Sequence, residues 1–242
     1  MRQARAPGVP VLLEGQGADE ALAGYPAYAV LDLVDFMRGR TSETRSFAAV
    51  SRRLRRLSAT FSPLWLLLWI GREVSPALLA WHRSRTGFQS LLRPGVAIPP
   101  PLALDDLPQG GDAVRRRLLS DHARNILPGL LQYGDAVSMA HSIEARNPFL
   151  DYRLVEWMFR LPTAFKLRDG ETKWVLREYL RSTGQASIGN RSDKRGYPTP
   201  VAQWLLSDPA GLERRLLDGN SPLVAWCDPH KVRRLIEQVA QG

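Results

Sequence analysis

The pattern of apolar and polar residues along the chain predicts a mainly helical protein with one short strand. The first apolar run, residues 9–13, lies between Gly8 and Gly15 and is typical of a strand buried in a parallel sheet. A single strand leaves its backbone hydrogen-bonding groups unpaired. We therefore expect the partner strands to lie outside these 242 residues.

The rest of the chain predicts helices and loops. Residues 41–57 and 112–127 each place their apolar side chains on one face at helical spacing, and residues 171–181 predict a further helix. Residues 94–111 are rich in proline and glycine, which predicts a loop within one domain.

Three aspartates mark the starts of later helices. Asp208 and Asp228 are each followed by proline, which combines an N-cap carboxylate with the residue preferred at the first helical position. Asp151 is placed to cap a helix over residues 153–159. These signals are local, so they predict where helices begin without any knowledge of the tertiary fold.

Composition indicates an ordinary globular protein, because 44% of the residues are hydrophobic and 24% are charged. The longest apolar run, residues 61–70, is about half of the ~20 residues that a membrane-spanning helix needs. It predicts a core or partner-facing helix, with attachment to a membrane surface as the alternative. No signal-peptide pattern opens the sequence, and we expect a cytoplasmic protein with no membrane span.

The net charge of +9 does not by itself indicate a nucleic-acid partner. Arginines are spread through the helical segments beside acidic residues, and the dense cluster at residues 52–56 lacks the aromatics of a single-strand-binding surface. We expect no nucleic-acid binding. Cys227 is the only cysteine, which excludes an intrachain disulfide and predicts a small buried side chain.

The most informative segment is the turn that follows the strand, with Gly15, Gly17, Asp19 and Glu20 in the order G-Q-G-A-D-E. Glycines at a strand-to-helix turn allow backbone N–H groups to approach an anion closely. The acidic pair supplies oxygen ligands that suit Mg²⁺ beside phosphates. The alternative is an ordinary tight turn in which Asp19 caps the helix.

Two later segments also carry candidate chemistry. Residues 133–151 gather Ser138, His141, Glu144 and Arg146 before a proline-led turn. The simpler interpretation is a local ion pair between Glu144 and Arg146, with His141 on a helix surface. Residues 193–200 hold Lys194 in a loop restrained by prolines, where a compact cation can neutralise phosphate charge. Exposed loop charge is the alternative there.

Taken together, the segments G-x-G-A-D-E, S-M-A-H-S-I-E-A-R-x-P-F-L-D, D-G-x-T-K (residues 169–173) and K-x-G-Y-P-T-P closely resemble the C-terminal half of glutamine-dependent asparagine synthetases. The resemblance implies an α/β fold: the C-terminal part of an adenine-nucleotide-alpha-hydrolase-like (PP-loop ATPase) synthetase domain, mainly helical here with one short core strand. It places that portion at residues 1–205, followed by a helical tail of the same domain at 206–242.

The resemblance also implies a reaction in which aspartate, ATP and ammonia from glutamine give asparagine, AMP and pyrophosphate. ATP and Mg²⁺ are the implied cofactors. Asp19 matches the Mg²⁺–pyrophosphate carboxylate, with Glu20 beside it, and Gly15 and Gly17 would form the turn around the substrates. Lys194 matches the catalytic loop cation.

The resemblance further places Glu144 and Arg146 in the segment that closes the pocket. It implies a catalytic role for Glu144 and a nucleotide-binding role for Arg146. Gln16 departs from the family, since many of its members carry glutamate between the glycines. A neutral amide cannot act as a general base. Gln16, also a candidate catalytic residue, therefore leaves the carboxylic acid and the nitrogen donor open.

A second departure is that the family's S-G-G-x-D-S phosphate loop and its glutaminase domain do not occur in the sequence. We expect a fragment, or a chain that needs a partner, and no catalysis by the isolated chain. A non-catalytic interaction module and a related enzyme acting on another carboxylate are the alternatives. Self-association is left open.

Overall fold

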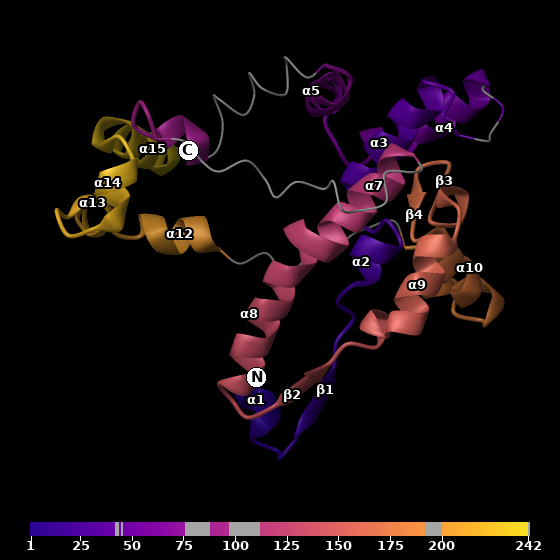
Figure 1. Ribbon diagram of the computed structural model, residues 1–242, viewed down its shortest axis with the longest axis horizontal. Coiled ribbons are helices and arrows are strands. Elements are labelled where there is room, and N and C mark those ends of the chain that lie inside the picture. The colour runs from indigo at the N-terminus through magenta and orange to yellow at the C-terminus, as the bar shows by residue number, and fades with distance from the viewer. Residues whose placement is uncertain (42–43, 45, 76–87, 97–111, 192–199, 242) are drawn as a thin grey trace. The chain divides into compact units, whose positions relative to one another are not determined.

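The computed structural model describes residues 1–41, 44, 46–75, 88–96, 112–191 and 200–241 (Figure 1). The chain divides into two compact units, which are described separately. Unit 1 comprises Met1–Val74 and Leu102–Arg191, and unit 2 comprises Ser75–Pro101 and Ser192–Gly242. Within the described ranges, no helix is long and apolar enough to cross a membrane.

Unit 1 is mainly helical. Its first half contains α1 (Arg2–Arg5), β1 (Val11–Leu13), α2 (Ala18–Ala21), α3 (Pro26–Met37), α4 (Phe47–Ser58) and α5 (Pro63–Val74). Its second half contains α7 (Ala113–Ser120), the π-helix η2 (Asp121–Asn125), α8 (Leu127–Met139), β2 (Glu144–Arg146), η3 (Pro148–Leu150), α9 (Tyr152–Arg160), η4 (Thr163–Phe165), β3 (Leu167–Arg168), β4 (Glu171–Thr172), α10 (Trp174–Ser182) and α11 (Ala186–Gly189).

Helix α3 is the centre of the unit 1 core. Tyr28, Val30, Leu33 and Phe36 are almost completely buried, and α4, α5 and α7 pack against the helix. Figure 1 shows α7, η2 and α8 following one another as one long helical run. The prediction of a helix over 112–127 is therefore correct in position, but a π-helical turn interrupts the regular winding.

The strand predicted at residues 9–13 is present as β1, and its partner belongs to the same chain. β1 pairs in parallel with β2, with Val11 opposite Glu144 and Leu13 opposite Arg146. The expectation that every partner strand lies outside the chain is thus wrong for one edge of β1. Burial on both faces is also wrong, because Leu13 is 75% exposed.

β3 and β4 form a second small sheet, an antiparallel hairpin. Ionic contacts of Arg53 connect this hairpin to α3 and α4. Arg53 of α4 is fully buried and its Nε donates a hydrogen bond to the Asp32 carboxylate at 2.9 Å. Its guanidinium also lies 4.1 Å from the centre of the Phe36 ring and 3.6 Å from the Asp169 carboxylate. β4 occupies the first two residues of the helix predicted over 171–181. The observed helix, α10, therefore starts only at Trp174.

The predicted helix starts are confirmed. Asp151, Asp208 and Asp228 accept hydrogen bonds from the backbone N–H groups of Arg153 (3.0 Å), Gly211 (2.8 Å) and His230 (2.9 Å). The helix predicted over 41–57 begins later, at Phe47, because Ser46 caps it by accepting from the Ala49 N–H.

Unit 2 is a small helical unit. Its elements are η1 (Phe88–Leu91), α12 (Val201–Leu206), α13 (Pro209–Leu217), α14 (Pro222–Trp226) and α15 (Pro229–Gln241). Leu92, Cys227, Val232 and Ile236 form its core, and Leu92 pairs with Cys227 through an isolated antiparallel bridge. Cys227 is buried with a free thiol, as predicted.

Candidate functional site

The turn after β1 is held close to the segment after β2. Gly17 begins α2 with φ of +91°, a conformation that favours glycine. A Cβ atom at Gly17 would lie 2.3 Å from the Leu150 side chain of η3. The parallel pairing of β1 with β2 explains this contact, because both strands end at the same edge of the sheet.

Asp19 lies in the first turn of α2, where its carboxylate forms an ion pair with Lys173 at 2.8 Å. It does not cap the helix, since Gly17 occupies the N-cap position and no side chain caps it. The backbone N–H of Lys173 donates to the Leu22 carbonyl at 3.1 Å, which fixes the segment after β4 against the end of α2. The Lys173 and Asp19 side chains remain 29% and 28% exposed, although Oδ1 of Asp19 is itself buried.

Glu20 is placed differently from its neighbour, because its side chain is buried. It accepts a hydrogen bond from the Tyr25 hydroxyl at 2.6 Å. Burial and the Glu20 carboxylate both raise the pKa of Tyr25, so this hydroxyl remains a donor. Glu20 therefore supports the turn from within the core.

A second buried hydrogen-bonding group lies behind the turn, between α3 and the π-helix η2. Tyr28 donates to the Asp121 carboxylate at 3.0 Å, and Arg117 donates to the same carboxylate at 2.7 Å. Next to it, the His122 ring packs edge-on against Phe159, with the centroids 5.2 Å apart. Burial lowers the pKa of His122, which favours the neutral imidazole.

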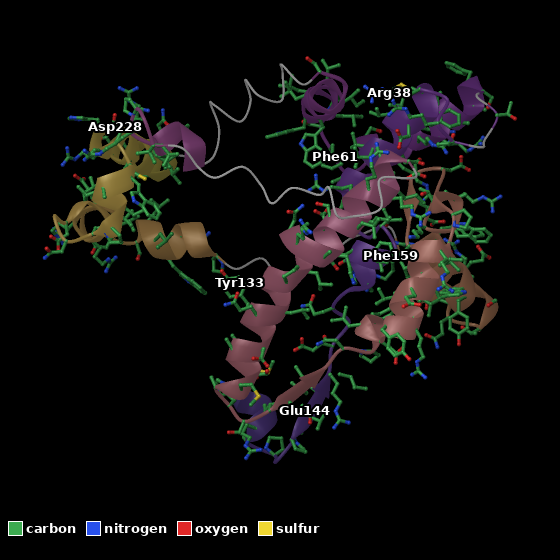
Figure 2. All side chains as sticks on the ribbon, in the orientation of Figure 1. Arg38, Phe61, Tyr133, Glu144, Phe159 and Asp228 are labelled. Carbon is green, nitrogen blue, oxygen red and sulfur yellow. The ribbon has the colours of Figure 1, made fainter. Side chains whose placement is uncertain are left out.

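Glu144 and Arg146 form a bidentate ion pair on the exposed side of β2, with N–O distances of 2.8 and 3.2 Å. The hydrogen bond from Arg146 lowers the pKa of Glu144. Figure 2 labels Glu144. The local ion pair considered as the simpler interpretation is therefore present. Within the described residues neither side chain forms a hydrogen bond or ion pair with the turn, although the Arg146 carbonyl accepts from the Glu14 N–H at 2.8 Å.

The remaining candidates are distributed as follows. Gly15 is exposed and has open space where a Cβ would lie, and Gln16 is half-buried. Ser138 is buried and donates to the Asp135 carbonyl, while His141 is half-buried and contacts the Val137 carbonyl. Lys194 lies outside the described residues. The structure thus brings the glycine turn and the end of β2 together.

The family model for asparagine synthase matches residues 1–242. The chain belongs to the asparagine synthase family. It is 29% identical over 220 residues to a protein of Mycobacterium tuberculosis named putative asparagine synthetase [glutamine-hydrolyzing], a match that covers 81% of the chain and 31% of the relative. It is 38% identical over 104 residues to asparagine synthetase [glutamine-hydrolyzing] 3 of Bacillus subtilis, covering 40% of the chain and 17% of the relative.

A shorter match, 33% identical over 82 residues, is to a protein of Gibberella zeae named amidase chry2 and covers 31% of the chain and 12% of that relative. The chain spans less than a third of the length of the curated asparagine synthetases that it matches. No solved structure matches the chain.

Members of the asparagine synthase family use ATP, and the family resemblance also implies Mg²⁺. The described residues contain no group of three metal-ligating side chains. Mg²⁺ in nucleotide sites, however, is usually bound by one or two carboxylates together with phosphate oxygens. Asp19 fits as one such ligand because its carboxylate is partly exposed, whereas Glu20 is buried and already bonded to Tyr25.

Sequence reasoning missed three residues of this region: Lys173, Tyr25 and Asp121. Lys173 ends the D-G-x-T-K segment, which was noted, but nothing in that segment indicates its ion pair with Asp19. Tyr25 follows Glu20 by five residues, across the end of a short helix, so helical spacing did not connect them. Asp121 accepts a hydrogen bond from Tyr28 of α3, which lies 93 residues earlier in the sequence, so local spacing gave no signal for this pair.

Proposed function

We propose that this chain forms part of an ATP-dependent carbon–nitrogen ligase that makes an amide from a carboxylic acid, as asparagine synthetases do. The proposed reaction converts aspartate, ATP and ammonia from glutamine to asparagine, AMP and pyrophosphate. One observation carries the proposal: the glycine turn and the segment after β2 meet at the carboxyl ends of two parallel strands in a member of this family. Ligands of open α/β sheets bind at such ends.

The proposed roles follow from the placement of each side chain. The backbone N–H groups around Gly15 and Gly17 would contact phosphate oxygens, and Asp19 would hold Mg²⁺ together with those oxygens. Mg²⁺, when bound, neutralises phosphate charge. Lys173 keeps the Asp19 carboxylate oriented at the start of α2.

Lys194 is proposed as the cation that stabilises charge on the transferring phosphate. Because that charge grows as the reaction proceeds, Lys194→Ala is expected to lower turnover by about 10²–10³ rather than to raise the Michaelis constants. Lys194→Arg should restore little activity, since the planar guanidinium group of arginine differs in reach from the ammonium group of lysine. Normal turnover with raised Michaelis constants would assign Lys194 to substrate binding instead.

The overall proposal is tested by acid-dependent exchange of pyrophosphate into ATP. We expect no exchange by the chain alone, and aspartate-dependent exchange once a polypeptide carrying the S-G-G-x-D-S segment is added. Asp19→Asn should lower this exchange and raise its Mg²⁺ requirement, whereas Asp218→Asn, on an exposed aspartate of unit 2, should not. Absence of exchange with every acid under both conditions would favour a non-catalytic interaction module.

A second candidate, favoured by Gln16, is amide formation on a carboxylate other than that of aspartate. Gln16 is a neutral amide at the position between the two glycines of the turn. The same exchange assay with a panel of carboxylic acids separates the two candidates. If aspartate is the substrate, it alone should support exchange; a different acid would support the second candidate.

A further inference from the structure

The described side chains of α5, all of which precede Arg72 and Glu73, are apolar on every side of the helix, although one side faces solvent. Leu66 is buried in the unit 1 core, and Phe61 (labelled in Figure 2) packs against Trp69 with ring centroids 5.5 Å apart. On the opposite side Leu64, Leu67 and Leu68 recur at helical spacing, and Leu67 is 68% exposed. A helix with no polar face is normally covered on all sides.

The exposed side of α5 continues into an apolar groove shared with α4. Phe47, Leu54, Leu67 and Ile70 line this groove, which has a volume of about 440 Å³, and Phe47 is 89% exposed. We call the exposed residues Phe47, Leu54, Arg55, Leu64, Trp65 and Leu67 the α4–α5 surface. All of them belong to unit 1, so the surface is defined without reference to unit 2.

Charge indicates what kind of partner covers this surface. Helices α4 and α5 together contain five arginines and a single acidic residue, Glu73. Arg52, Arg53 and Arg56 pair with acidic groups of unit 1, but Arg55 lines the groove and forms no ion pair with any described residue. A second copy of the chain docked by the same face would bring two such basic surfaces together.

We propose that the α4–α5 surface docks on an anionic lipid membrane. Exposed Leu and Phe side chains, a tryptophan and adjacent arginine are the composition of helices that lie in the membrane interface. Tryptophan favours that depth because its ring is apolar and its N–H is polar, and arginine is attracted to anionic headgroups. α5 has 12 residues, which is too short to span a bilayer but sufficient to lie along one.

The experiment is co-sedimentation of the full chain with two kinds of vesicle, phosphatidylcholine alone and an equal mixture of phosphatidylcholine and phosphatidylglycerol. We expect binding to the mixed vesicles that weakens with added salt, and little binding to phosphatidylcholine. Leu64→Ser/Leu67→Ser should weaken binding about tenfold or more by removing two inserted side chains. Arg55→Glu should weaken it by about an order of magnitude on mixed vesicles only.

The matched control is Tyr133→Ser/Val137→Ser, which removes two exposed apolar side chains of α8 and should leave binding unchanged (Figure 2 labels Tyr133). Circular dichroism of each variant checks that it remains folded. No binding of the parent chain to mixed vesicles, or equal binding of the parent and the α5 double variant, would overturn the proposal. Concentration-dependent self-association abolished by Leu64→Ser/Leu67→Ser, without vesicle binding, would assign the surface to a second copy.

Discussion

Lys166 occupies an unusual position for a lysine, because its side chain is only 1% exposed. Its ammonium group lies 4.9 Å from the centre of the Phe159 ring. Burial, followed by the charge of Arg115, lowers the pKa of Lys166 to about 8, while Asp112 opposes this shift. The fold therefore holds a positive charge at neutral pH at a cost in stability.

Lys166→Met is expected to raise the free energy of unfolding at pH 7 by about 1–3 kcal/mol, since it replaces a buried charge with an apolar chain of similar length. Between pH 8 and 10 the unfolded chain keeps the Lys166 proton while the native state releases it. The stability of the parent therefore rises over this range relative to the variant. Urea unfolding of both proteins at several pH values measures the difference; a constant difference would contradict the lowered pKa.

At the same scale, sequence could identify Asp19 as a candidate ligand but could not predict its surroundings. The G-Q-G-A-D-E order depends on neighbouring residues, and it correctly predicted a glycine turn, in which the structure gives Gly17 a positive φ. The ion pair of Asp19 with Lys173 joins residues that are far apart in the chain. Ion-pair partners that are distant in the sequence depend on how the helices pack, and the local order of residue types does not predict that packing.

The Asp19–Lys173 ion pair packs directly against the backbone of Gly24. A Cβ atom at Gly24 would lie 1.7 Å from the Asp19 carboxylate and 2.4 Å from Lys173 Cε. Gly24→Ala should therefore displace the Asp19–Lys173 pair and destabilise unit 1 by about 1–3 kcal/mol. Gly129→Ala is the control, because a Cβ there meets open space in α8 and should be neutral or stabilising. Chemical denaturation compares the two; equal stabilities would contradict the close contact.

The attachment of α4 to α3 and the β3–β4 hairpin depends on Arg53. Arg53→Met should cost about 3–5 kcal/mol, because the buried Asp32 carboxylate loses the donor that compensates its charge. Arg53→Met/Asp32→Leu should recover part of this loss. Arg160→Met, which breaks the exposed pair with Glu156, should change stability by less than about 0.5 kcal/mol. A similar loss of unfolding free energy in Arg53→Met and Arg160→Met would show that burial does not determine how much the Arg53–Asp32 pair contributes to stability.

Among elements, helix starts were predictable and the second strand was not. The caps at Asp151, Asp208 and Asp228 depend on side chains two or three residues from the N–H groups they bind. β2, in contrast, reads E-A-R, without the apolar run that marked β1. Its strand conformation comes from pairing with β1, and hydrophobic patterning could not reveal it.

At the scale of the whole molecule, the small parallel sheet has no further strand on either side within the described residues. Exposed apolar residues on such an edge favour pairing between chains. We expect concentration-dependent association of the chain, and Leu13→Lys should reduce it by placing a charge on β1. Light scattering at rising concentration is the measurement. Undiminished association of Leu13→Lys would direct attention to another surface.

The family and the mainly helical character of the chain were accessible from sequence, because four separated segments match one family in order. The division at residue 205 between the domain portion and its tail stays a prediction. Residues 192–242 form a second compact unit together with residues 75–101. This grouping depends on packing between segments that are distant in the sequence. The local pattern of apolar and polar residues does not predict such packing.

The pairing of β1 with β2 also has a consequence for the order in which the chain acquires its structure. The strand near the amino terminus finds its partner only at Glu144–Arg146, after the long helical run of α7 and α8. Closing so long a loop is slow compared with forming local helices. During synthesis on the ribosome, the pairing of β1 with β2 therefore cannot form until residues 144–146 have emerged. The candidate site is completed late, when the helices that surround it can already be folded.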